Sequence, residues 1–149
     1  MTIGVFCNRE VVYATRAMSL TEAAQLMRNY HVGDLVVVDE VDDKCVPVGI
    51  VTDRDMVIQV IAKALDFDDF SVGDIMSLQL VSVQENAGVF ETIRLMRTKG
   101  IRRIPVVNQD GGLVGIVTAD DMLDLLAEEL AELAKVAPRE QASEAKTRA

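Results

Sequence analysis

The sequence predicts an α+β fold made of two β-α-β-β-α repeats, packed by their sheets into one pseudo-two-fold unit. Two internal repetitions predict it. The string Gly49–Met56 (GIVTDRDM) returns as Gly115–Met122 (GIVTADDM), and the helical pattern around Met27 returns around Met96. One repeat of roughly 60 residues makes a poor core alone, so we expect the two to bury their apolar faces against each other.

Each repeat has the same order of elements. Short strands are expected at 11–13 and 80–82, and each leads into a helix with apolar residues at helical spacing, Ala23, Leu26 and Met27 or Val89, Ile93 and Met96. A hairpin follows, with strands at 35–38 and 48–51 in the first repeat and at 104–107 and 113–117 in the second. Asp110-Gly111 is a hairpin-turn signal, and the first repeat carries a short insertion at the same place. A closing helix completes each repeat.

The repeats predict the boundaries 2–64 and 71–136, followed by a mobile tail at 137–149 because REQASEAKTRA is almost devoid of apolar residues. The last helix begins near Ala119 and extends beyond its counterpart in the first repeat. Its stripe consists of Met122, Leu125, Leu126, Leu130 and Leu133. This stripe docks on its own domain, on a second subunit or on a partner, and the sequence leaves these three open.

Composition excludes several classes of function. The 149 residues carry 24 acidic and 15 basic side chains, a net charge of −9, which disfavours sequence-independent binding of nucleic acid. The chain shows neither a signal peptide nor an apolar run long enough for a membrane span. Its two cysteines, Cys7 and Cys45, are too far apart for a CxxC site, which favours reduced thiols and a cytoplasmic protein.

The strings GIVTDRD and GIVTADD, behind VVVD and IPVVN, resemble those of tandem CBS (cystathionine-β-synthase-type) domains, which pair into a Bateman module. The resemblance covers residues 2 to about 128, and its specificity comes from the motif occurring twice in the right order. It implies a non-catalytic sensor that binds an adenosine-containing ligand, AMP or ATP, in a cleft between the repeats. It also implies a homodimer, no required cofactor and an effector protein that the sequence does not identify.

The pairs Thr52/Asp55 and Thr118/Asp121 stand where a strand meets a helix. Free N–H groups and the positive end of the helix dipole at such a junction favour a phosphate. The resemblance implies that each Thr contacts the phosphate and that each Asp accepts from the ribose hydroxyls. The alternative is that Thr-x-x-Asp forms an N-terminal capping box, and both roles can coexist.

The two clefts are expected to differ in charge. Arg102 and Arg103 precede Ile104-Pro105, where the family often has cations that hold a phosphate, whereas the first repeat has Gly33 and Asp34 there. We therefore expect both arginines to reach across to the Thr52/Asp55 cleft, with Arg54 joining them. Solvated surface charge is the alternative for the two arginines.

The opposite cleft carries Asp120 and Asp121, with Asp34 nearby, and would repel a phosphate. With few aromatic residues in the chain, an aliphatic slot is expected for adenine. The expected lining is Val12, Val81 and Ile104, with Tyr13 as a further candidate.

Three other functions have to be compared with a ligand sensor. An enzyme is disfavoured because the chain has one histidine, His31, no threonine with an adjacent base and no GxxxxGK[ST] loop. A structural zinc site is disfavoured because Cys7, His31 and Cys45 are fewer than four ligands. A structural pairing module that acts through the leucine stripe without binding a nucleotide stays open.

Overall fold

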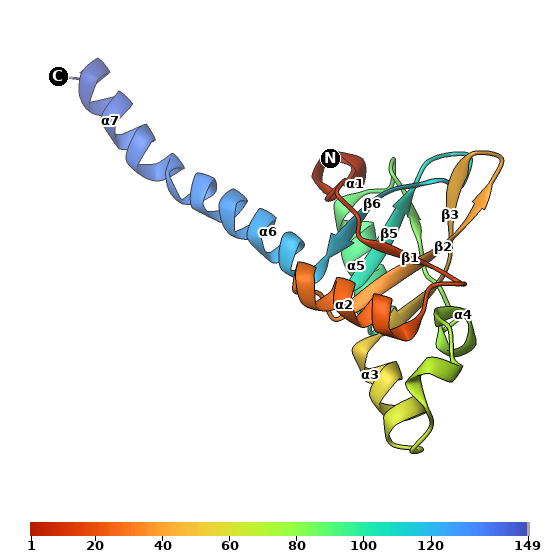
Figure 1. Cartoon of the computed structure of the whole chain (residues 1–149). Helices are drawn as coiled ribbons and strands as arrows, with labels where there is room; N and C mark the ends of the chain where they lie inside the picture. Colours follow the sequence, from red (N-terminus) through yellow and green to blue (C-terminus); the bar gives the residue numbers. More distant parts are fainter. Residues whose placement is uncertain (149) are drawn as a thin grey trace.

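The computed structural model describes residues 1–148, and its elements follow the predicted repeat (Figure 1). The first repeat contains α1 (Ile3–Phe6), β1 (Tyr13–Thr15), α2 (Leu20–Tyr30), β2 (Asp34–Val41), β3 (Lys44–Thr52), α3 (Asp53–Met56) and the π-helix η1 (Val57–Ile61). A 3-10 turn, η2 (Phe67–Asp69), connects the two. The second repeat contains α4 (Val72–Ile75), β4 (Val83–Gln84), α5 (Val89–Lys99), β5 (Arg103–Val107), β6 (Leu113–Thr118), α6 (Ala119–Ala134) and α7 (Val136–Arg148).

The strands form two three-stranded sheets of identical topology, which confirms the predicted fold class. In each, a short first strand runs parallel to the second, and the second and third strands form an antiparallel hairpin. The first strands begin two or three residues later than predicted. Residues 11–12 and 80–82 precede the parallel ladder, which starts where Tyr13 pairs with Val36 and Val83 with Val106.

The hairpin turns explain the length difference between the repeats. In the first repeat the longer hairpin turns at Asp42 and Asp43, between β2 and β3, and both residues have a positive φ, of 50° and 62°. In the second hairpin Gly111 has φ 82°, and the Asn108 side chain accepts hydrogen bonds from the N–H groups of Asp110 and Gly112. Both turns lie where the sequence predicts them.

Two apolar cores hold the repeats together, and each contains residues from both. Val72 and Ile75 of α4 complete the core of the first repeat, while Ile3 of α1 and Cys7 complete that of the second. The segment that begins each repeat therefore packs on the other repeat. Ile3 and Val72 have no exposed surface, so each adds about 1.5–3 kcal/mol of burial to the repeat that it enters.

Backbone pairing makes this exchange reciprocal. Ser77 and Ile50 exchange two N–H···O bonds of 2.8 and 3.0 Å, and Asn8 and Ile116 exchange two of 2.8 and 2.9 Å. β3 and β6 also contact each other. The repeats are thus interlocked, as the predicted packing of one repeat on the other requires.

The C-terminal region differs from the prediction. Residues after Pro138, expected to form a mobile tail, continue as the helix α7, none of whose residues is buried. Pro138 fits because it lies in the first turn, where a missing N–H leaves no helical bond unmade. Figure 1 shows α6 and α7 extending away from the two sheets. Leu130 and Leu133 are 65% and 67% exposed, so this part of the stripe does not dock on its own domain.

Within residues 1–148, no helix combines the length and the apolar composition needed to cross a membrane.

Candidate functional site

Both predicted strand-to-helix corners form, and each is closed by a capping box. At the first, the Thr52 hydroxyl accepts from the Asp55 N–H and the Asp55 carboxylate accepts from the Thr52 N–H, both at 3.0 Å. At the second, Thr118 and Asp121 make the same two bonds at 3.1 and 3.0 Å. The capping alternative is therefore realised in this structure, and a ligand at either corner would exchange these partners for its own groups.

The residue just before β2 or β5, the first strand of each hairpin, hydrogen-bonds to the first residue of the helix at the corner. The Asp53 N–H donates to the Gly33 carbonyl at 3.0 Å, and the Ala119 N–H donates to the Arg102 carbonyl at 2.8 Å. The antiparallel ladders extend this proximity by pairing Asp34 with Thr52 and Arg103 with Thr118. Asp34 and Arg103 consequently occupy equivalent places in the two repeats.

These two equivalent residues contact each other across the repeats. Arg103 Nε lies 2.9 Å from Asp34 Oδ2, and the two side chains are 31% and 20% exposed. Because Asp34 pairs with Thr52 in the ladder, the contact places a cation of the second repeat beside the first corner. Arg103 therefore crosses to the first repeat, where its partner is Asp34, and its role toward a ligand at Thr52 and Asp55 stays a prediction.

The prediction that Arg102 also crosses is wrong. Arg102 Nη2 pairs with Asp120 Oδ1 at 2.9 Å within its own repeat, and both side chains are about three-quarters exposed. Arg102 precedes β5, and its side chain lies over the start of α6. Its charge therefore offsets the second corner's acidity, and the difference between the corners is smaller than expected.

Arg54 lies at the first corner with an exposed side chain. Its N–H donates to Asp53 Oδ1 at 2.8 Å. Over residues 1–148 its guanidinium has no carboxylate within 4.0 Å. This leaves Arg54 available to a ligand at that corner.

Asp34, beside the first corner, has a raised pKa. Burial raises the pKa of Asp34 most, Arg103 lowers it, and Asp53 raises it further. The net pKa shift is upward, so Arg103 does not fully compensate for the burial of the Asp34 carboxyl.

The residues predicted to hold adenine are spread over different environments. Ile104 has no exposed surface and packs in the second core, and Pro105 is also buried. Ile104 is therefore not free to line a slot, because inward-facing positions of β5 serve the core. Tyr13 is 43% exposed, and Val81 is half-buried.

Val12 borders a cavity of about 560 Å³ between the segment before β1 and helix α2. The other lining residues are Asn8, Arg9, Glu10, Val11, Leu26, Tyr30 and Val32. Sequence reasoning missed Arg9 and Tyr30, because they belong to no repeated motif and meet only through the fold. Asp121 borders a smaller cavity, of about 250 Å³, with Phe6, Asn8, Asp124, Leu125 and Glu128.

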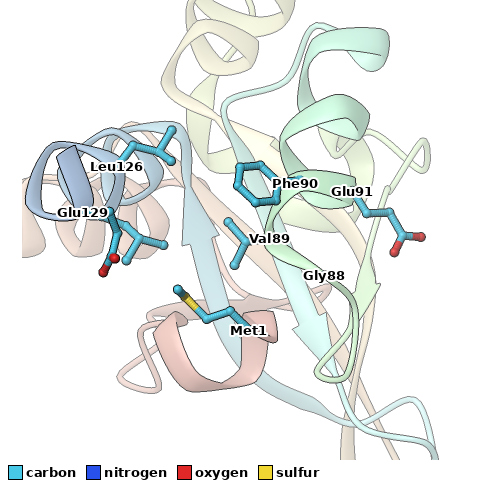
Figure 2. Close-up of a pocket in the computed structure, with 8 residues that line it drawn as sticks. Met1, Gly88, Val89, Phe90, Glu91, Leu126 and Glu129 are labelled. Carbon is cyan, nitrogen blue, oxygen red and sulfur yellow. The ribbon is translucent and has the colours of Figure 1, made fainter. Parts of the chain in front are cut away.

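A third cavity, of about 350 Å³, lies between the start of α5, helix α6 and Met1 (Figure 2). Val89, Phe90 and Leu126 give it apolar walls, and Glu91 and Glu129 lie at its edge. None of the predicted ligand residues borders it. Within the described part of the chain, no three His, Cys, Asp or Glu side chains are grouped so that they could hold a metal ion.

Comparison with known proteins gives a family. The CBS domain model matches residues 3–61 and 72–128. An uncharacterized protein of Methanopyrus kandleri is 38% identical over 125 residues, which cover 84% of this chain and 62% of that protein. Hypoxic response protein 1 of Mycobacterium tuberculosis is 36% identical over 128 residues, covering 86% of this chain and 82% of that protein.

Solved structures agree. Hypoxic Response Protein I, crystallised with two coordinated zinc ions, is similar to this chain with a TM-score of 0.72 and 33% identity, over 83% of this chain and 98% of that one. CBSX2 in complex with AMP has a TM-score of 0.72 and 26% identity, over 85% and 96% of the two chains. The duplicated motif, the two matching sheets and these likenesses together show that the chain belongs to the CBS domain family, as a tandem pair of its domains.

Proposed function

We propose that this CBS pair is a non-catalytic regulatory module that binds an adenosine-containing ligand, AMP or ATP, at the corner formed by Thr52 and Asp55. The contact between Arg103 and Asp34 carries the proposal, because it brings a cation of one repeat beside the corner of the other. A cleft that gathers groups from both repeats allows a ligand to report on their relative position.

The groups at the corner match the parts of a nucleotide. The Thr52 hydroxyl and the Asp55 N–H that it caps suit a phosphate that replaces this capping bond, and Arg103 and Arg54 add positive charge. The Asp55 carboxylate suits the two ribose hydroxyls. Val12, beside its cavity, and Tyr13 are the candidates for the adenine contact. AMP in the crystal structure of the similar CBSX2 supports this class of ligand.

The second corner is proposed as a weaker site. Thr118 and Asp121 reproduce the geometry of the first corner, and Arg102 supplies its cation. However, Asp120 already pairs with that arginine, and both are exposed, which lowers the gain from a phosphate.

Calorimetric titration of AMP and ATP into Asp55→Ala and Asp121→Ala tests the assignment. Asp55→Ala removes two charge-assisted bonds of about 1.5–3 kcal/mol each, so we expect affinity to fall about a hundredfold or more. Asp121→Ala is a matched control, because it removes an identical capping bond from the other corner. Equal losses in both variants, or a loss in Asp121→Ala only, would overturn the assignment.

A second candidate function is a ligand-free pairing module. The exposed Leu130 and Leu133 favour it, since no surface of their own domain covers them. A thermal-shift screen separates the candidates, because a nucleotide at 100 times its Kd adds about 2.7 kcal/mol of stability. Stabilisation by no adenosine compound would favour the pairing module.

We also propose that the chain is a cytoplasmic homodimer in which a second copy covers this leucine face. Cys7 and Cys45 are free thiols, as a reducing compartment requires. Sedimentation velocity should give a dimer for the wild type and a monomer for the Leu130→Glu variant. A monomeric wild type would contradict this proposal.

A further inference from the structure

Arg103, a cation of the proposed site, already forms an ion pair with a side chain of the protein itself. Arg103 Nε donates to Asp34 Oδ2 at 2.9 Å, and both side chains are largely removed from solvent. A phosphate that binds Arg103 must therefore displace Asp34 from it or share it with Asp34. At the second corner Arg102 likewise pairs with Asp120, but both side chains there are about three-quarters exposed, so the competition at the first corner is the less solvated one.

A second carboxylate strengthens the competition. A Cβ at Gly33 would lie 3.3 Å from Asp53 Oδ2, which places the Asp53 side chain against the residue that precedes Asp34. Asp53 raises the pKa of Asp34, as expected for a neighbouring carboxylate. Asp55, on the same helical turn, adds a third carboxylate.

Resting on the proposed function, we propose that Asp34 selects the charge of the ligand, so that this corner takes an adenosine monophosphate in preference to a triphosphate. One phosphate group can be balanced by Arg103 and Arg54. Among residues 1–148, no salt bridge brings a further cation to Asp34, so the additional charges of a triphosphate face the exposed Asp53 and the partly buried Asp34, whose repulsion is weakly screened. Asp34 is thus a specificity-determining residue.

The test is the ratio of the Kd for ATP to the Kd for AMP, measured by calorimetry without divalent cations. In the wild type we expect AMP to bind more tightly than ATP. Asp34→Asn keeps the shape of the side chain and removes its charge, so the ratio should fall by about tenfold. Asp34→Ser serves as a second variant with the same expected direction if the asparagine variant does not fold.

Asp39→Asn is the matched control. Asp39 lies on the same strand, β2, and also pairs with an arginine at 2.9 Å, but that arginine is Arg16, away from the corner. Its ratio should equal that of the wild type. An unchanged ratio in both Asp34 variants, with wild-type binding intact, overturns the selectivity and leaves the proposed function standing. A wild type that binds neither nucleotide overturns both.

Discussion

The reciprocal crossing of the two repeats predicts a large cost for adding one methyl group at Gly49. A Cβ at this position would lie 2.6 Å from the carbonyl oxygen of Ser77, the residue whose backbone pairs with Ile50. Gly115 is its equivalent, where a Cβ would lie 2.6 Å from Cys7 Sγ and 2.9 Å from the carbonyl oxygen of Asn8. Both glycines therefore stand where a segment of one repeat crosses the sheet of the other.

The magnitude follows from these contacts. Ser77 cannot retreat without lengthening its two hydrogen bonds to Ile50, each of which contributes about 0.5–1.5 kcal/mol. Overpacking adds about 1–3 kcal/mol. We therefore expect Gly49→Ala to lower the free energy of unfolding by about 2–6 kcal/mol, a large fraction of the 5–15 kcal/mol typical of a domain.

Urea denaturation followed by circular dichroism measures the change, with Gly88→Ala as the control. A Cβ at Gly88 meets nothing closer than 3.9 Å and its φ is −76°, so we expect a change below about 1 kcal/mol. At Gly115 the closest atom is a side-chain sulfur, so Cys7→Ala should partly rescue Gly115→Ala and leave Gly49→Ala unaffected. If Gly49→Ala is as stable as Gly88→Ala, the crossing described above is refuted.

Two further predictions concern buried polar groups. Thr92 is fully buried, and its hydroxyl donates to the Gly88 carbonyl at 2.8 Å. Thr92→Val should therefore lower the free energy of unfolding, measured by urea denaturation, by about 1 kcal/mol. Thr98 is exposed on the same helix, so the control Thr98→Val should lower it by less than about 0.5 kcal/mol. The pKa of Asp34 is raised in the folded state, so its carboxyl stays protonated to a higher pH in the folded protein than in the unfolded one. The contribution of this carboxyl to the free energy of unfolding therefore falls as the pH rises above about 3.9, the pKa of an unfolded Asp. As the pH rises from 4 to 7, the free energy of unfolding of Asp34→Asn, measured by urea denaturation, should therefore increase relative to that of the wild type. A relative decrease over this range would contradict the upward pKa shift.

Local patterns were sufficient for most of the fold. The duplicated motif predicts both corners, and Asp110-Gly111 predicts a hairpin that the structure contains. No sequence pattern predicts that α1 packs on the second repeat and α4 on the first. Gly4 and Gly73 recur at equivalent positions, yet a repeat unit has the same sequence pattern whether its first segment packs on itself or on its neighbour.

The site was predictable in its backbone and less so in its side chains. Thr-x-x-Asp implies a local geometry, and the structure has it twice. The partners of Arg102 and Arg103 depend on which repeat each side chain reaches, and adjacent residues differ in this respect. Ile104 illustrates the same limit, because burial in the second core is decided by packing and not by the motif around it.

The contact between Asp34 and Arg103 gives a physical reason for keeping the two repeats in one chain. Equivalent residues meet near a pseudo-two-fold axis, so two identical repeats would bring either two carboxylates or two guanidinium groups together there. Either like-charge pair would be repulsive at a partly buried position. Duplication within one chain allows the two positions to diverge into an opposite pair, and the same divergence makes the corners unequal toward a charged ligand. The asymmetry that avoids a like-charge pair between the repeats is therefore the asymmetry on which the proposed ligand selectivity depends.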